Sequence, residues 1–150
     1  SAAKMAADGS DLPAIVKMVE EKAQRTFSFA ILNTLEFLRR SGRVSRLAAG
    51  LGSLLNIKPM LIMHAGDLKL EKIRTTRGAI DRLIKLVEEV GPLEEIALVY
   101  THTLQKARDL QKTASHLFPN QVKIWAEEVN PVIGAHVGPG AVGIVCIAAK

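Results

Sequence analysis

The spacing of apolar side chains along the chain changes between two periods, and each period predicts a different kind of element. Between residues 77 and 90 they recur every three or four positions, which is the spacing of one helix face. They are Ile80, Leu83, Ile84, Val87 and Val90. Thr76 stands before this segment as a helix cap, and Gly91-Pro92 ends it. This is the clearest helix in the sequence.

Other segments carry weaker helix signals. Ser10 or Asp11 caps a helix with Leu12, Ile15, Val16 and Val19 on one face, and Thr34 caps a short helix that Gly42 closes. Further helices are expected from Ser45, from Leu104 to Phe118, and as a short turn that begins at Pro131. Residues 2–7 are also helical in composition, but no capping residue precedes them. We therefore expect residues 1–9 to be the end of a truncated helix.

Strand patterns fill the rest of the chain. Alternating or continuous apolar runs occupy residues 26–32, 94–102, 121–128 and 141–149. Two further runs flank Ala65-Gly66, which predicts a hairpin. Pro59 cannot donate to a sheet, so it belongs at a strand start or an edge. The pattern predicts a single α/β domain in which helices cover at least one face of the sheet.

Composition narrows the class of protein. The chain has 150 residues, 48% hydrophobic and 23% charged, which is ordinary for one globular domain. Only 4% are aromatic, so the core is expected to be aliphatic, and the net charge of +5 is compatible with an acidic partner or anionic ligand. No apolar run approaches ~20 residues, and the first residues do not resemble a signal peptide. A single cysteine, Cys146, in an apolar run indicates no disulfide framework and a cytoplasmic location.

The most unusual segment is NPVIGAHVGPGAVGI, residues 130–144. It groups four glycines around His136, namely Gly134, Gly138, Gly140 and Gly143. Glycines let the backbone approach a ligand closely, and successive amides can hold an anion. The alternative is a tight loop that His136 merely caps. The letters also match G-x-G-x-x-G, but a strand follows instead of a helix, so a dinucleotide site is not indicated.

A second segment, residues 35–59, combines positive charge with an aliphatic face. Arg39, Arg40, Arg43 and Arg46 lie close together, either as a solvated face or as a docking surface for an acidic partner. Interleaved aromatic residues are lacking, which argues against nucleic acid. The aliphatic face is made by Leu47, Leu51, Leu54, Leu55 and Ile57. Such a face serves either core packing or an acyl tunnel.

Residues that would support catalysis or metal binding are scattered. His64, His102 and His116 lack metal-ligand spacing, and no nucleophile motif of the G-x-S-x-G kind occurs. Paired glutamates lie at the ends of elements, where they act as solubilising charge. The sequence therefore gives no support for an enzyme, a cofactor or a metal.

The two unusual segments together resemble the DegV family. LEFLRRSGRVSRLAAGLGSLLNIKPML is similar to the family's leucine run, its Gly-Arg step and its strand entry, and the closing motif is similar to Ser-Pro-Val-Ile-Gly-Thr-His-Thr-Gly-Pro-Gly. Asn130 replaces the common Ser, and Ala135 and Val137 replace common Thr residues, so two hydroxyls of the loop are lost. The likeness covers nearly all 150 residues.

The resemblance implies that residues 1–150 are the carboxy-terminal domain of a two-domain protein, with its amino-terminal domain absent. The implied fold is a two-layer mixed sheet of about six strands with helices, related to the substrate-binding part of dihydroxyacetone kinases. The implied function is to hold a long-chain fatty acid in an aliphatic tunnel and to present its carboxylate to a separate fatty-acid kinase.

The resemblance also assigns residues to these roles. His136, with Gly134, Gly138 and Gly140, would hold the carboxylate together with hydroxyls of the absent domain. The acyl chain would lie along Leu51, Leu54, Leu55 and Ile57. Arg43, with Arg40, would meet the kinase. The alternative from another class is an enzyme or phospho-acceptor domain for a small hydroxylated substrate.

Overall fold

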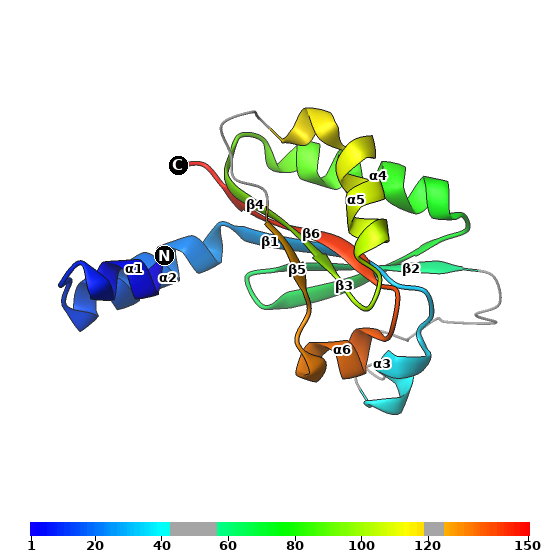
Figure 1. The fold of residues 1–150 in the computed structure, drawn as a ribbon, viewed down its shortest axis with the longest axis horizontal. Coiled ribbons are helices and arrows are strands. Elements are labelled where there is room, and N and C mark those ends of the chain that lie inside the picture. The colour runs from blue at the N-terminus through cyan, green and yellow to red at the C-terminus, as the bar shows by residue number, and fades with distance from the viewer. Residues whose placement is uncertain (43–56, 119–124) are drawn as a thin grey trace.

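The computed structural model describes residues 1–42, 57–118 and 125–150. At the centre of this part of the chain is one sheet in the order β3-β2-β1-β6-β4-β5 (Figure 1). The strands are β1 (Thr26–Ile31), β2 (Lys58–His64), β3 (Asp67–Ile73), β4 (Leu93–Tyr100), β5 (Trp125–Glu128) and β6 (Val142–Ala148). Neighbouring strands are antiparallel except β4 and β5, which are parallel. The predicted α/β class and mixed sheet of about six strands are confirmed.

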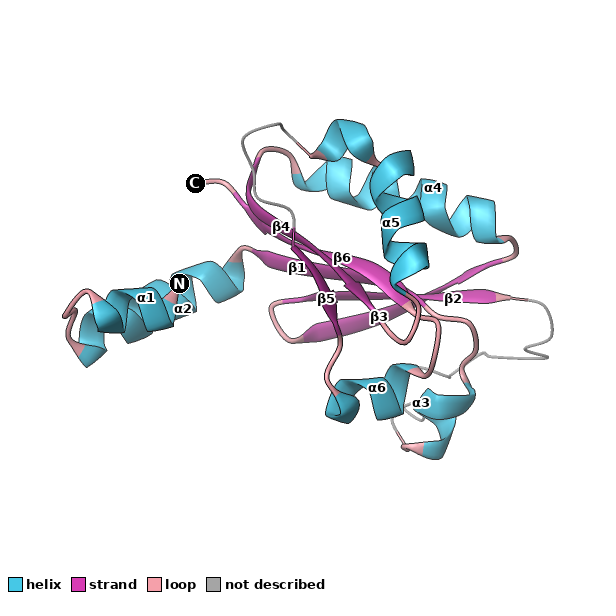
Figure 2. Cartoon of the chain, in the orientation of Figure 1, coloured by secondary structure: helices cyan, strands magenta, loops and turns pink. Residues whose placement is uncertain are grey.

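Helices lie on both sides of this sheet, but unequally. They are α1 (Ala2–Ala7), α2 (Leu12–Gln24), α3 (Glu36–Arg40), α4 (Thr76–Val90), α5 (Leu104–Thr113), the 3-10 turn η1 (Ser115–Leu117) and α6 (Pro131–Val137). Figure 2 shows α4 and α5 along one face of the sheet, with α3 and α6 together at one end of the opposite face. We call these the covered face and the open face.

The main core lies between the covered face and helices α4 and α5. Leu83 of α4, Leu98 of β4 and Ile144 of β6 are each fully buried there. Helix α4 buries Leu83 and Val87 as its periodicity predicted. Its cap is Thr75 and not Thr76, because the Thr75 hydroxyl accepts the Gly78 amide at 3.0 Å.

The predicted hairpin is confirmed. Ala65 and Gly66 have φ of 48° and 86°, as a tight two-residue turn with both residues left-handed requires. Pro59 is the second residue of β2, a strand with neighbours on both sides. Its position agrees with a strand start, and its carbonyl accepts the Leu32 amide at 2.8 Å.

Three helix predictions turn out differently. The segment predicted from Leu104 to Phe118 is helical only to Thr113, and η1 follows. The helix expected from Ser45 lies outside the described residues. Helix α2 begins after Asp11 as predicted, but its apolar face buries no side chain. Leu12 is 71% exposed, and α1 and α2 pack together beyond one end of the sheet (Figure 1).

Candidate functional site

Small side chains form a trough along the middle of the open face. In β1 the larger Phe27, Phe29 and Ile31 belong to the main core, so the alternate Ser28 and Ala30 point to the open face. Ala30 pairs with Gly143 of the neighbouring strand, and Ser28 pairs with Val145.

Gly143 is required by its surroundings, because a Cβ there would strike the Phe29 carbonyl oxygen. Bulkier side chains stand on both sides of these small residues. Leu61 and Met63 come from β2, and Val99 comes from β4. The open face is therefore hollowed along the line where β1 meets β6.

This trough contributes to a groove of about 320 Å³. Helix α6 supplies Ile133 and Val137, spaced one turn apart on the same helix face, and Asn130 lies before the helix. The remaining lining is Ser28, Ala30, Leu61, Met63, Val99, Tyr100, Glu127, Glu128, Val129, Ala141, Val142, Gly143 and Val145. The lining is predominantly apolar, and the volume falls at the lower end of the range for small-molecule sites.

The glycine-rich segment forms α6 and the turn after it. The Asn130 side chain accepts the Ile133 amide at 3.0 Å and Pro131 is the first helical residue, which confirms the predicted helical turn and extends it to seven residues. Gly134 lies within this helix. Gly138 and Gly140 have φ of 76° and 75°, in the left-handed region that glycine tolerates best.

The space beside these two left-handed glycines is filled by the protein itself. A Cβ at Gly138 would strike the Phe37 ring, and one at Gly140 would strike the Asn33 amide and the Lys106 ammonium. Both glycines are thus needed for packing of the turn against its neighbours. Their assignment as ligand contacts remains a prediction.

Buried polar groups hold the turn in place. The Thr101 hydroxyl donates to the Gly138 carbonyl at 2.7 Å and accepts the Ala141 amide at 2.8 Å. The Lys106 ammonium donates to the Gly140 carbonyl at 2.8 Å and to Asn33 Oδ1 at 3.2 Å. Burial and, to a smaller extent, the charge of Lys58 lower the pKa of Lys106.

Sequence reasoning missed these anchoring residues. The signal that was available is the position of Thr101 near the end of a buried strand, where a hydroxyl can bond to loop backbone.

His136 lies on α6, next to Val137, which lines the groove. Its side chain is partly buried, and its Nδ1 atom is fully buried without a hydrogen-bond partner among the described residues. A buried polar atom without a partner is uncommon in folded proteins, and it marks His136 as a residue to test. His136 itself is not part of the groove wall, so the structure places it beside the end of the groove and not within it.

The other predicted site residues are dispersed or lie outside the described residues. Arg43, Leu51, Leu54 and Leu55 lie outside the described residues. Ile57 packs against the smaller apolar cluster beneath α3 and α6, which contains Leu32, Leu35, Leu38, Leu61 and Ala141. Arg40 is exposed, and its Nε donates to Glu36 at 2.8 Å.

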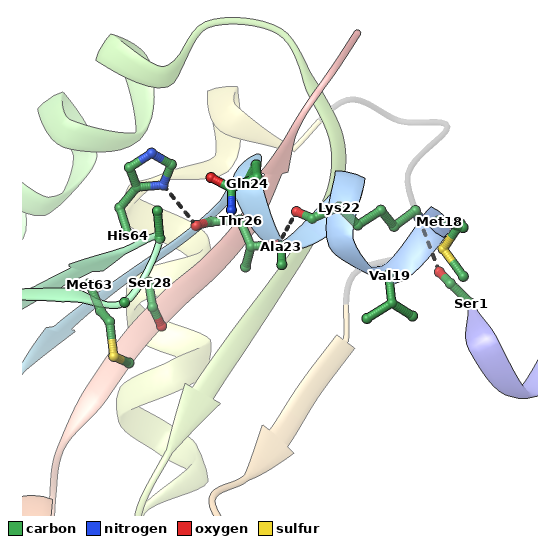
Figure 3. A pocket seen from close by; sticks show the side chains of 12 residues that line it. Ser1, Met18, Val19, Lys22, Ala23, Gln24, Thr26, Ser28, Met63 and His64 are labelled. Atoms are coloured by element: carbon green, nitrogen blue, oxygen red, sulfur yellow. Dashed lines mark hydrogen bonds between the residues drawn. The ribbon is translucent and has the colours of Figure 1, made fainter. Parts of the chain in front are cut away.

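A second hollow of about 550 Å³ continues the open face toward α2. Its lining includes Met18, Ala23 and Thr26, and it shares Ser28 and Met63 with the groove. Figure 3 shows the side chains of Ser28 and Met63 on the same side of the sheet, with His64 on the other. Both hollows are therefore parts of one depression on the open face.

Reactive groups in the described residues offer little chemistry. No three His, Cys, Asp or Glu side chains among them are grouped to hold a metal ion. Cys146 is buried in the main core, and burial raises the pKa of its thiol to about 11, so the thiol stays protonated near neutral pH. Within the same residues, no helix has both the length and the apolar character needed to cross a bilayer.

Comparison with known proteins shows one family along the whole chain. The model of the family described as "Uncharacterised protein, DegV family" matches residues 1–149. A DegV domain-containing protein of Streptomyces coelicolor is 34% identical over 148 residues, which cover 97% of this chain and 53% of that protein. The chain spans about half the length of the curated relatives it matches.

Solved structures agree with this match. "DegV, a fatty acid binding protein from Bacillus subtilis" has a TM-score of 0.79 and 32% identity, over 97% of this chain and 54% of that one. A fatty acid binding DegV family protein from Streptococcus agalactiae has a TM-score of 0.83 and 27% identity, over 99% of this chain and 54% of that one.

Proposed function

The chain belongs to the DegV family, and we propose that it is the part of a fatty-acid-binding protein that buries the acyl chain. The observation that carries this proposal is the apolar groove on the open face, lined by small side chains of β1 and β6. The two solved relatives whose names state fatty acid binding support the choice of ligand. Each methylene buried in such a groove contributes roughly 0.8 kcal/mol, so the tail supplies most of the affinity.

The carboxylate head group lies at the α6 end of the groove in this proposal. His136 is the residue that would bind it, because it lies on α6 next to the groove residue Val137 and its Nδ1 lacks a partner among the described residues. A hydrogen bond from an imidazole to a carboxylate contributes roughly 1.5–3 kcal/mol. Gly134, Gly138 and Gly140 would shape the segment that carries this histidine.

A preceding domain completes the site. The chain matches about half of each relative's length, and among the described residues α3 and α6 cover the open face at one end. We use "full-length protein" for this chain together with that proposed domain. The preceding domain would supply hydroxyl groups to the carboxylate and would cover the exposed apolar side chains Leu12, Val16 and Val19 of α2.

The full-length protein would act as a carrier in the cytoplasm and not as an enzyme. It would present the carboxylate to a separate fatty-acid kinase, with Arg43 and Arg40 facing the acidic surface of that partner. Arg40 is exposed and shares its charge with Glu36, so the contribution of this region is expected mainly in the rate and salt dependence of association. Arg43→Glu should lower kinase-dependent turnover and leave lipid affinity unchanged.

The apolar groove favours a lipid over a small hydroxylated substrate. A hydroxylated molecule needs several converging polar groups, and the described lining offers few besides Ser28, Asn130 and the two glutamates of β5. An enzyme or phospho-acceptor domain that acts on a small hydroxylated substrate is therefore the weaker alternative.

Native mass spectrometry of the full-length protein tests the proposal. We expect a co-purified long-chain fatty acid that is released on denaturation. Calorimetry should then show that the 150-residue chain alone binds the same acid more weakly, since part of the carboxylate site is missing. A full-length protein that neither carries nor binds fatty acid would contradict the proposed function.

A further inference from the structure

Ser28 and Met63 stand where the groove meets the second hollow. They are directly opposed on β1 and β2, and both line each of the two cavities. Toward α6 the floor continues with Ala30 and Gly143, which carry no polar side-chain atom. Toward α2 it continues with Thr26 and Ala23. A ligand that extends from the α6 end must pass this pair to reach the second hollow.

The Ser28 hydroxyl places a polar atom on the path that the acyl chain would follow. The side chain is partly buried, and no hydrogen bond joins its hydroxyl to another described residue. Water reaches the hydroxyl as long as the groove is empty. An acyl chain laid across it removes that water and offers no hydrogen bond in return.

The loss of affinity from burying this hydroxyl is comparable to the gain in affinity from lengthening the ligand. Burying a hydroxyl without a partner weakens binding by roughly five- to a hundredfold, whereas each added methylene strengthens binding by roughly fourfold. Passing Ser28 therefore offsets the gain from at least one and up to about three methylenes. Met63, 47% exposed and flexible, narrows the passage from the other side.

We infer that Ser28, together with Met63, determines how long an acyl chain the groove accepts. Chains that end over Ala30 and Gly143 are bound with the full benefit of burial. Longer chains gain little until they have crossed the hydroxyl. The inference rests on the proposed function and adds the residue that sets chain-length preference.

The test uses calorimetry on the full-length protein with lauric, myristic, palmitic and stearic acid. For the wild type, affinity should rise along this series and then level off. Ser28→Ala removes the hydroxyl, so the rise should continue, and the longest acid should gain roughly tenfold, equivalent to about 1.4 kcal/mol. Ser115→Ala is the matched control, because Ser115 is exposed on η1, away from both cavities. Its series should coincide with that of the wild type.

Met63→Ala provides a second arm that leaves Ser28 in place. Widening the passage should also favour the longer acids, by a smaller factor than Ser28→Ala. If both variants keep the wild-type profile while the wild type binds fatty acid, the chain-length inference is wrong and the proposed function stands. If the wild type binds none of the four acids, both are wrong.

Discussion

The two faces of the sheet are built from the same strands with opposite choices of side-chain size. In β6 the residues Ile144 and Cys146 enter the main core, whereas Gly143 and Val145 line the groove. Neighbouring β1 repeats this division. The covered face is closed by α4 and α5, whereas the helices of the described residues that lie on the open face, α3 and α6, stand at one end of it (Figure 2). The difference indicates that one face stabilises the domain and the other leaves room for a ligand.

The alternation of side chains along a strand allows the same strand to pack the core on one face and to line the groove on the other. Because successive side chains point to opposite faces, large and small residues can be chosen independently along one segment. The covered face follows the rule of dense packing. The open face is packed less densely along β1 and β6, because the side chains there are too small to fill the trough. A functional site is where such departures are expected.

The largest difference in the free energy of unfolding is expected between the variants Ile144→Ala and Val145→Ala. Ile144 is fully buried in the main core, so its truncation should lower the free energy of unfolding by about 2–5 kcal/mol. Val145 is half-buried beside the groove, so its truncation should lower the free energy of unfolding by about 1 kcal/mol or less. It should change the affinity for fatty acid instead. Denaturant unfolding and calorimetry separate the two effects. Equal losses of stability would mean that the open face is ordinary core.

Filling the trough should produce the next largest effect. Ala30→Leu places a larger side chain where β1 meets β6, and it should displace about three methylenes of the ligand. The expected loss is about 2–3 kcal/mol in binding, or roughly a hundredfold in affinity. Calorimetry with palmitic acid measures it, and circular dichroism confirms that the variant folds. Unchanged affinity in a folded variant would place the acyl chain elsewhere.

The covered face was the more predictable of the two. The spacing of Leu83 and Val87 predicted α4, and the apolar run around Ile144 predicted β6, because burial leaves a periodic pattern in the sequence. The capping residue was misplaced by one position, since Thr75 and Thr76 are adjacent and both can cap.

The open face was harder to foresee. The groove depends on which strands become neighbours, and the pairing of Ala30 with Gly143 joins residues 113 positions apart in sequence. Nothing local to Ser28 or Met63 indicates that they share a cavity. The glycine-rich segment was recognised, but Gly138 and Gly140 contact Phe37, Asn33 and Lys106, which only the tertiary structure reveals.

His136→Ala should affect binding and leave folding almost unchanged. In the full-length protein, loss of its hydrogen bond to the carboxylate should weaken fatty-acid binding by about ten- to a hundredfold. The melting temperature of the lipid-free variant should match that of the wild type, because His136 Nδ1 bonds to no described residue. A variant that melts earlier and binds lipid normally would show that His136 only supports the loop.

The smallest effect is expected at the attachment of α2 to the sheet. Hydrogen bonds from Lys22 and then Arg25 lower the pKa of Glu94 to about 2. A depressed carboxyl pKa contributes stability above the unfolded value of about 4.3, and this contribution is lost as pH falls toward 2. Glu94 is 37% exposed, so the contribution is about 1 kcal/mol at most.

Glu94→Gln is the matched variant for this carboxyl. Its melting temperature should lie slightly below that of the wild type near neutral pH, and the two should converge as pH approaches 2. A constant difference across that range would mean that the Glu94 charge is not what holds α2.

The position of the acyl chain relative to the two faces is the central claim, and isotope-filtered NMR tests it most directly. The full-length protein, labelled at Leu, Val and Ile methyl groups, would be loaded with unlabelled palmitic acid. We expect nuclear Overhauser contacts from the acyl chain to Leu61, Val99 and Val145 on the open face, and none to Leu98 or Ile144 on the covered face. Contacts to Leu98 and Ile144 without contacts to Val99 and Val145 would contradict the account.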